Sequence, residues 1–228
     1  MTITDYVVQV DAGSVSARHY VAGEQPRDPL ALILAHGAGA GQRHPFMVGF
    51  ATNLAARGID VVTFNFPYME ARRRVPDRAP VLEQAYLAVV GDTRQRVRAE
   101  ARSLFIGGKS MGGRMASHVA AHHAEAAGPL EGLVFLGYPL HPPGRPDQPR
   151  DAHLPRIVAP MLFVQGSRDA FGTPDELRPV LARVSAPVDL VVVEGGDHSF
   201  AVPRGSARSR GEVLDGIYDR VAAWMRGR

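Results

Sequence analysis

Short apolar runs of strand length alternate along this chain with longer stretches of helical periodicity. The runs fall at residues 30–35, 60–65, 103–107, 133–137, 161–165 and 188–193. Continuous apolar runs of this kind are typical of strands that are buried on both faces of a parallel sheet. Helical patterns lie between or after them, at residues 45–57, 81–101, 111–124, 174–184 and 210–226. The alternation predicts an α/β fold, with a mostly parallel sheet and helices on both faces.

Two segments depart from this alternation. Residues 6–10 and 14–20 have weaker alternating patterns and are separated by Asp11-Ala12-Gly13, which predicts an antiparallel hairpin at the edge of the sheet. Residues 138–155 contain six prolines where a full crossover helix would be expected, so we predict an ordered loop there. Neither a repeat nor a flexible linker is evident. We therefore expect one domain over residues 1–228, with no large cap domain.

The composition narrows the function classes. The 228 residues include no cysteine, which excludes disulfides, thiolate metal ligands and a cysteine nucleophile. The formal net charge is +3, but the arginines are scattered, which argues against nucleic acid as a partner. No apolar stretch approaches the length of a membrane span, and the first residues do not resemble a secretion signal. We expect a cytoplasmic protein that binds a small molecule and no membrane. The sequence leaves the oligomeric state open.

The pattern G-x-S-x-G occurs at residues 108–112, between an apolar run and a helical stretch. This is the context of a nucleophile elbow, a tight strand-to-helix turn that exposes a serine hydroxyl at the carboxyl edge of the sheet. Ser110 is the candidate nucleophile, and the backbone N–H of Met111 would point at a developing oxyanion. A plain glycine-rich turn is the simpler alternative. A phosphate loop is a poorer one, because the Walker pattern requires glycine where Ser103 stands.

A second glycine-rich loop, residues 36–41, follows the first buried strand. In a serine hydrolase this loop donates the second oxyanion N–H, for which we favour Ala38. We expect His36 to brace the loop. A dinucleotide-binding turn is the alternative, but its glycine pattern fails at Gln42.

Two more candidates follow later strands. Asp169 stands just beyond residues 161–165, where a carboxylate can orient a histidine across the sheet edge, although turn and capping aspartates are common in loops. His198 follows the last strand and is the candidate base. The order Ser110, Asp169, His198 matches the order of the α/β-hydrolase fold.

The remaining histidines have simpler interpretations. His118 and His122 stand four residues apart on one predicted helix, a spacing that can hold a metal ion, but the sequence offers no evident third ligand. We therefore predict no metal site there and interpret these histidines, with His123, as a solvated face.

Four longer motifs support the same fold. They are Ala35-His-Gly-Ala-Gly-Ala-Gly41, Phe64-Asn-Phe-Pro-Tyr-Met69, Gly107-Gly-Lys-Ser-Met-Gly-Gly-Arg-Met115 and Leu136-Gly-Tyr-Pro-Leu-His-Pro142. Together they resemble a small α/β-hydrolase family related to dienelactone hydrolases, which includes the testis-expressed and NSL-complex hydrolase-like proteins. The resemblance implies a cofactor-free serine hydrolase with the three residues above. It implies no substrate, and the serine at position 110, where dienelactone hydrolases have cysteine, places dienelactone itself in doubt.

The sequence thus predicts a serine hydrolase, carboxylesterase-like, that cleaves a small ester or related acyl bond. Tyr68 and Arg72 follow one strand, and His141 flanks the proline-rich segment, so we expect all three to contact substrate. The arginines at 72–74 could attract an anionic group, although a solvated charge run is an equal alternative. The alternative from another class is a non-catalytic interaction module built on the same fold. Lys109, the single lysine, either raises the potential at the elbow or packs beneath the turn.

Overall fold

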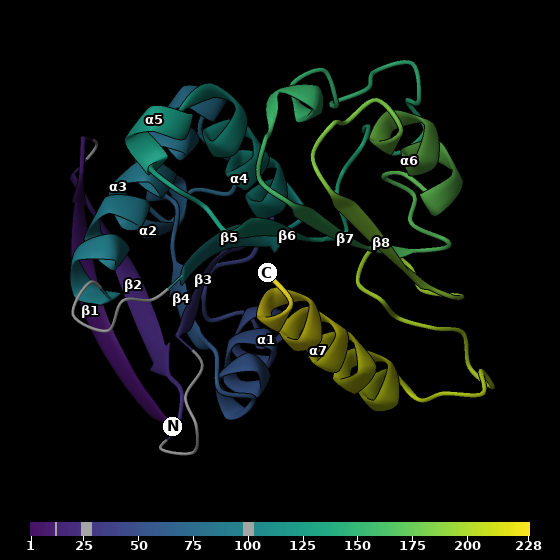
Figure 1. Cartoon of the computed structure of the whole chain (residues 1–228), viewed down its shortest axis with the longest axis horizontal. Coiled ribbons are helices and arrows are strands. Elements are labelled where there is room, and N and C mark those ends of the chain that lie inside the picture. Colours follow the sequence, from purple (N-terminus) through teal and green to yellow (C-terminus); the bar gives the residue numbers. More distant parts are fainter. Residues whose placement is uncertain (12, 24–28, 98–102) are drawn as a thin grey trace.

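The protein is built around one eight-stranded sheet (Figure 1). The structure is a computed structural model that describes residues 1–11, 13–23, 29–97 and 103–228. The strand order is β1-β2-β4-β3-β5-β6-β7-β8. β4, β3 and β5 to β8 are parallel to one another, whereas β1 and β2 run antiparallel to their neighbours at one edge. The strands are β1 Thr2–Val10, β2 Gly13–Val21, β3 Leu30–Ala35, β4 Asp60–Phe64, β5 Ser103–Lys109, β6 Gly132–Leu136, β7 Met161–Gly166 and β8 Val188–Val193.

Helices cover both faces of this sheet, as the sequence predicts (Figure 1). α1 (Pro45–Ala56) and α7 (Arg210–Arg226) pack on one face and contribute to one apolar cluster. α3 (Ala79–Val97), α4 (Met111–His122) and α6 (Pro174–Leu181) pack on the other face and contribute to a second cluster. Two four-residue helices, α2 (Pro67–Glu70) and α5 (Ala124–Ala127), lie on this same side. Burying both faces removes the apolar strands from water, which is the main stabilising contribution in such a fold.

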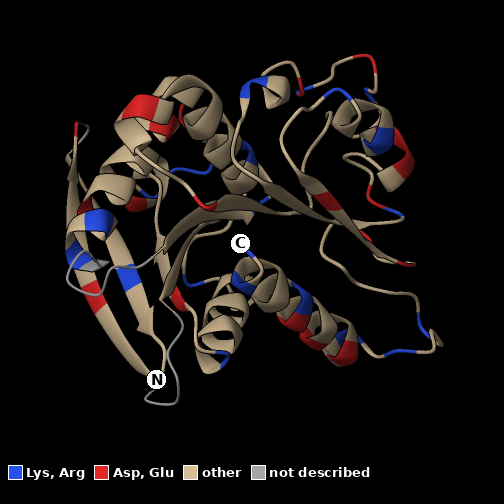
Figure 2. Cartoon of the chain, viewed as in Figure 1, with Lys and Arg blue, Asp and Glu red and all other residues tan. Residues whose placement is uncertain are grey.

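Ion pairs join the two helices of the first face. Arg57, which caps α1, donates to Asp215 at 2.5 Å and to Asp219 at 2.7 Å, both on α7. Acidic and basic residues are mixed along α7 in Figure 2, so its outer surface carries no single sign of charge. Exposed pairs of this kind contribute little to stability, and the apolar side of α7 is what fixes its position.

The predicted elements agree with the structure, with differences at their ends. The edge hairpin is longer than predicted, because its paired residues run from Thr2 with Val21 to Val10 with Gly13. The helix predicted at 81–101 begins at Ala79, and residues 98–101 of that prediction lie outside the described residues. The helix predicted at 111–124 ends at His122, because His123 leaves helical geometry with φ −131°. The helix predicted at 174–184 ends at Leu181.

The proline-rich segment is a loop between β6 and β7, as predicted. Its one helical turn within the described residues is η2 (Leu154–Arg156). No separate cap is built from this segment, so loops and the ends of the surrounding helices border the carboxyl edge of the sheet. Across residues 1–11, 13–23, 29–97 and 103–228, the helices are too short or too polar to span a lipid bilayer.

Candidate active site

The turn between β5 and α4 exposes the hydroxyl of Ser110. Ser110 has φ 52° and ψ −117°, in a region that residues with a side chain rarely adopt. The turn is tight because glycines allow close backbone contacts. A Cβ at Gly108 would lie 2.6 Å from the carbonyl oxygen of Ala35, and a Cβ at Gly112 would lie 2.3 Å from the same atom. The geometry is that of a nucleophile elbow.

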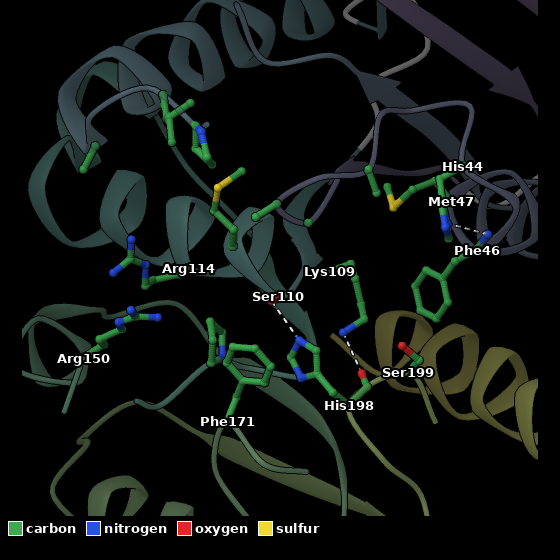
Figure 3. A pocket seen from close by; sticks show the side chains of 18 of the residues that line it. His44, Phe46, Met47, Lys109, Ser110, Arg114, Arg150, Phe171, His198 and Ser199 are labelled. Carbon is green, nitrogen blue, oxygen red and sulfur yellow. Dashed lines mark hydrogen bonds between the residues drawn. The ribbon is translucent and has the colours of Figure 1, made fainter. Parts of the chain in front are cut away.

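A chain of hydrogen bonds joins the three predicted residues, and Figure 3 shows the contact between Ser110 and His198. The Nε2 atom of His198 lies 2.9 Å from the Oγ atom of Ser110. On the other side of the ring, Nδ1 lies 2.8 Å and 3.0 Å from the two carboxylate oxygens of Asp169. A carboxylate only accepts, so Nδ1 carries the proton and Nε2 is left to accept from the serine. The sequence therefore located all three side chains that meet here.

Asp169 is fixed by further contacts. Its side chain is fully buried, and it accepts hydrogen bonds from Nε2 of Gln165 at 2.9 Å and from the backbone N–H of Phe171 at 2.8 Å. The Phe171 ring also stacks on the imidazole of His198, with centroids 4.2 Å apart. These contacts hold the carboxylate and the ring in one orientation, which a hydrogen-bonded relay requires.

Lys109 stabilises the loop that carries His198. Its Nζ atom donates to the backbone carbonyl of His198 at 2.7 Å (Figure 3). The ammonium also lies 5.8 Å from the ring centroids of Phe46 and of Phe200. Burial lowers the pKa of Lys109 to about 8, and the nearby carboxylates of Asp169 and Asp197 offset part of that shift.

The glycine-rich loop after β3 is braced by His36, as predicted. Nδ1 of His36 donates to the carbonyl of Gly37 at 2.8 Å, and Nε2 accepts from the backbone N–H of Phe66 at 3.1 Å. Both ring nitrogens are thus used, and burial lowers the pKa of His36 to about 4, so the ring stays neutral. His36 is a structural residue of the loop.

A cavity of about 490 Å³ opens above Ser110 at the carboxyl edge of the sheet. Ser110 and His198 line it, and so do Ala38 and Met111, the two residues predicted to donate oxyanion N–H groups. Apolar side chains that include Phe46, Met47, Leu82 and Phe171 make up much of the rest of the wall. An apolar cleft with a few convergent polar groups is the usual form of a small-molecule site.

Comparison with known proteins agrees with this geometry. A family model for an alpha/beta hydrolase domain matches residues 28–226. The chain belongs to this family. The narrower resemblance to the testis-expressed and NSL-complex hydrolase-like proteins stays a prediction.

Three solved structures illustrate the shared hydrolase fold. An α/β serine hydrolase homologue from Coxiella burnetii superposes with a TM-score of 0.76 at 19% sequence identity, covering 97% of this chain and 98% of that one. An α/β serine hydrolase without lid from Xanthomonas campestris superposes with a TM-score of 0.73 at 20% sequence identity, covering 98% of this chain and 95% of that one. A dienelactone hydrolase from Anabaena variabilis superposes with a TM-score of 0.71 at 17% sequence identity, covering 100% of this chain and 99% of that one. At these identities the likeness is one of fold.

The three residues predicted to contact substrate are not among those that line the cavity of this hydrolase domain. Tyr68 is fully buried, and its ring packs edge-on against His36 at 5.9 Å. Arg72 is exposed on the loop after α2, with φ 54°. His141 uses Nδ1 to donate to the carbonyl of Pro142 and Nε2 to contact Glu176 of α6 at 3.2 Å. Contacts hold Tyr68 and His141 away from the cavity, and Arg72 lies exposed outside it. The order of residues along the chain does not reveal these directions.

Other residues take their place around the serine. Arg114, Arg150 and Phe171 line the cavity, and none of them was predicted. A signal for Arg114 was present in the sequence, because a residue four positions after Ser110 lies on the same helical face. Arg150 lies within the proline-rich loop, and its direction depends on tertiary contacts.

A group of titratable residues outside the cavity corrects the prediction about the helix histidines. His118 and His123 are hydrogen-bonded to the two carboxylate oxygens of Glu83, at 2.7 Å and 3.0 Å. They therefore attach α4 to α3 and are not a purely solvated face. Glu83, His118 and His122 also have ligand atoms within 4.8 Å of one another, so Glu83 is the third potential metal ligand that the sequence did not reveal. An ion there would have to displace the hydrogen bond between Glu83 and His118.

Proposed function

We propose that this chain is a serine hydrolase that cleaves a small carboxylic ester through an acyl-enzyme on Ser110. The observation that carries the proposal is the continuous hydrogen-bonded chain from Asp169 through His198 to Ser110, at the floor of a cavity. Serine alone is a weak nucleophile at neutral pH, and an adjacent oriented base is what activates it.

In the first half of the reaction, Nε2 of His198 takes the hydroxyl proton as Oγ of Ser110 attacks the ester carbonyl. The carbonyl oxygen becomes an oxyanion, which the N–H groups of Met111 and Ala38 stabilise. Loss of one such donor typically costs about 3 kcal/mol of barrier. When the intermediate collapses, the bond to the alcohol oxygen breaks, and His198 returns the proton to that oxygen.

In the second half, the same imidazole takes a proton from water, and the resulting hydroxide attacks the acyl carbon. Collapse of the second intermediate breaks the bond to Oγ, and His198 returns the proton to Ser110. The products are a free acid and an alcohol. Asp169 stabilises the imidazolium that forms in each half.

Several observations support an enzyme over an interaction module. The family model and the fold of the solved serine hydrolases are consistent with hydrolysis. The dienelactone hydrolase among them acts, by its name, on a cyclic ester. The strained conformation of Ser110 also favours catalysis, since backbone strain of this kind is concentrated at functional sites.

The direct test compares Ser110→Ala with Ser185→Ala, which alters an exposed serine in the loop before β8. The wild type and Ser185→Ala should hydrolyse a para-nitrophenyl ester and be labelled by a fluorophosphonate. Ser110→Ala should do neither while it unfolds at the same temperature. Equal labelling of all three proteins would place the nucleophile elsewhere, and absence of turnover by any of them would favour the interaction module.

A further inference from the structure

Two arginines line the cavity beside the proposed nucleophile. Arg114 and Arg150 lie on the same side of Ser110 in Figure 3, opposite to Lys109 and Phe46. The mechanism above uses neither of them.

The backbone fixes where each arginine can reach. Arg114 lies one helical turn beyond Ser110, and its backbone N–H donates to the carbonyl of Ser110 at 3.1 Å. Residues four apart on a helix have Cβ atoms about 5–6 Å apart on the same face. Arg150 is held at the end of the proline-rich loop, where its N–H donates to the carbonyl of Leu140 at 2.7 Å and its carbonyl accepts from the hydroxyl of Tyr138 at 2.9 Å. Both side chains therefore start from rigid positions.

Among the described residues, neither guanidinium is held directly by a carboxylate. In the described part of the chain, no ion pair joins Arg114 or Arg150 to a carboxylate, and the buried Nε atom of Arg114 has no hydrogen-bond partner. The pKa of Arg114 is lowered, first by burial and then by the positive charge of Arg150, and the nearby Tyr138 and Glu83 offset only part of that shift. A partly buried guanidinium without a partner is costly. Two adjacent ones are best explained by an anion that binds between them.

The other charged groups of the cavity do not cancel the positive charge of these two arginines. Asp77 is the one carboxylate among the described residues that line the cavity, and its Oδ1 atom accepts from Arg73 at 2.5 Å while its Oδ2 atom has no hydrogen-bond partner. One carboxylate cannot balance both arginines. Lys109 donates to the carbonyl of His198, on the opposite side of Ser110. Arg210 adds one more positive charge to the lining.

We propose that Arg114 and Arg150 form an oxyanion subsite that selects esters carrying a second, anionic group, a carboxylate or a phosphate, a few bonds from the scissile carbonyl. The inference rests on the proposed function, since it names the substrate class of the same cavity. A guanidinium offers parallel N–H donors that match the oxygens of a carboxylate or a phosphate. The short distance from Ser110 to Arg114 along α4 limits the spacer to a few carbons.

The test uses esters that differ in charge but hardly in shape. The substrates with an anionic acyl group are mono(para-nitrophenyl) glutarate and para-nitrophenyl phosphonobutanoate. Their neutral partner is methyl para-nitrophenyl glutarate. A third pair, acetylated para-hydroxybenzoate and acetylated para-hydroxybenzamide, places the charge on the alcohol. The wild type should prefer at least one anionic ester over its neutral partner by about tenfold to a hundredfold in kcat/KM, as expected for a charged hydrogen bond. The preferred ester identifies the anion and its position.

The variants are Arg114→Gln and Arg150→Gln, with Arg145→Gln as the matched control. Arg145 is an exposed arginine of the same proline-rich loop and does not line the cavity. Each of the first two variants should lose most of the preference, so that the ratio of kcat/KM between the anionic ester and its neutral partner falls toward one. Arg145→Gln should behave as the wild type. Retained turnover of the neutral ester also shows that each variant is folded.

Two results would overturn the subsite: equal rates on every charged and neutral pair, or an equal loss on both members of a pair in the glutamine variants. A calorimetric titration with glutarate and phosphonobutanoate at low salt keeps the inference separate from the proposed function. If the wild type hydrolyses no ester, the proposed function fails. The subsite then stands if an anion binds and the binding is lost in Arg114→Gln and Arg150→Gln, and it fails if neither anion binds.

Discussion

The ammonium of Lys109 donates a hydrogen bond to the backbone carbonyl of His198, 2.7 Å away, so the residue before the nucleophile holds the loop that carries the base. The ring of the same histidine contacts Ser110 from the other side. Gly137, with φ 66°, leaves room for the contact, because a Cβ there would lie 2.9 Å from Nζ of Lys109 and 3.1 Å from the carbonyl oxygen of His198. Lys109 is therefore a positioning residue for His198.

Replacing Lys109 should change the pH profile of the reaction. The pKa of Lys109 is lowered by burial to about 8, so the side chain is charged below that pH and loses its charge above it. We expect kcat of the wild type on a neutral ester to fall as the pH rises through about 8. In Lys109→Met this alkaline limb should disappear, and kcat at neutral pH should fall about tenfold, the cost of one hydrogen bond from a charged group.

The control for this prediction is Lys109→Arg. A guanidinium stays charged at every pH of the assay, so the alkaline limb should also disappear in this variant, whereas kcat at neutral pH should stay above that of Lys109→Met. Equal unfolding temperatures for the three proteins at neutral pH would separate positioning from general stability. An unchanged alkaline limb in Lys109→Met would show that another group titrates there.

Replacing Asp169 with asparagine should preserve the shape of the site and reverse its hydrogen bonding. The asparagine amide can donate to Nδ1 of His198, which favours the tautomer whose Nε2 carries a proton and cannot accept from Ser110. We expect Asp169→Asn to lower kcat by about 10³-fold to 10⁴-fold, as in other hydrolases with this relay. Asp175→Asn, in an exposed position on α6, is the control and should leave kcat unchanged. A loss below about tenfold would contradict the role of Asp169.

The parts of the site that the sequence predicted are those fixed by backbone geometry. The glycines around Ser110 reflect contacts that admit no side chain, and this requirement is visible in the sequence. Asp169 and His198 follow parallel strands, whose carboxyl ends meet at one edge. Their positions after these strands therefore predict that both lie near Ser110, although the sequence shows no contact between them.

The parts that the sequence missed depend on the direction of individual side chains. Tyr68, on the short helix α2, and Arg150, in the proline-rich loop, both follow strands at the carboxyl edge of the sheet, and either could have faced the cavity. Tyr68 is instead buried against His36, whereas Arg150 is directed by backbone contacts with Leu140 and Tyr138. These contacts join residues that are not neighbours in the sequence, and hydrophobic periodicity contains no information about them.

Adding a methyl group at Gly112 should prevent the elbow from forming. The new Cβ would lie 2.3 Å from the carbonyl oxygen of Ala35, a backbone atom of the central sheet that cannot move aside. We expect Gly112→Ala to lose more than about 4 kcal/mol of stability or to fail to fold. Gly91→Ala on α3 is the matched control, because its Cβ would meet no atom within 4 Å, and it should gain up to about 1 kcal/mol. Thermal unfolding measures both, and equal melting temperatures would contradict the prediction.

Acidification should destabilise the protein partly through His36. Burial lowers the pKa of His36 to about 4 from an ordinary value of 6.5, so its contribution to stability is complete above about pH 6.5 and is lost as the pH falls toward 4. The loss amounts to about 3 kcal/mol, at 1.36 kcal/mol for each pKa unit. Urea unfolding across this range should show a smaller acid loss in His36→Leu than in the wild type. The variant should also be about 1–3 kcal/mol less stable at neutral pH, because the N–H of Phe66 loses its acceptor.

Part of the acid loss should remain, since burial also lowers the pKa of His153, to about 3. His122→Gln, at an exposed position, is the control for a general effect of removing a histidine. If His36→Leu loses as much stability in acid as this control does, His36 does not contribute to the acid loss.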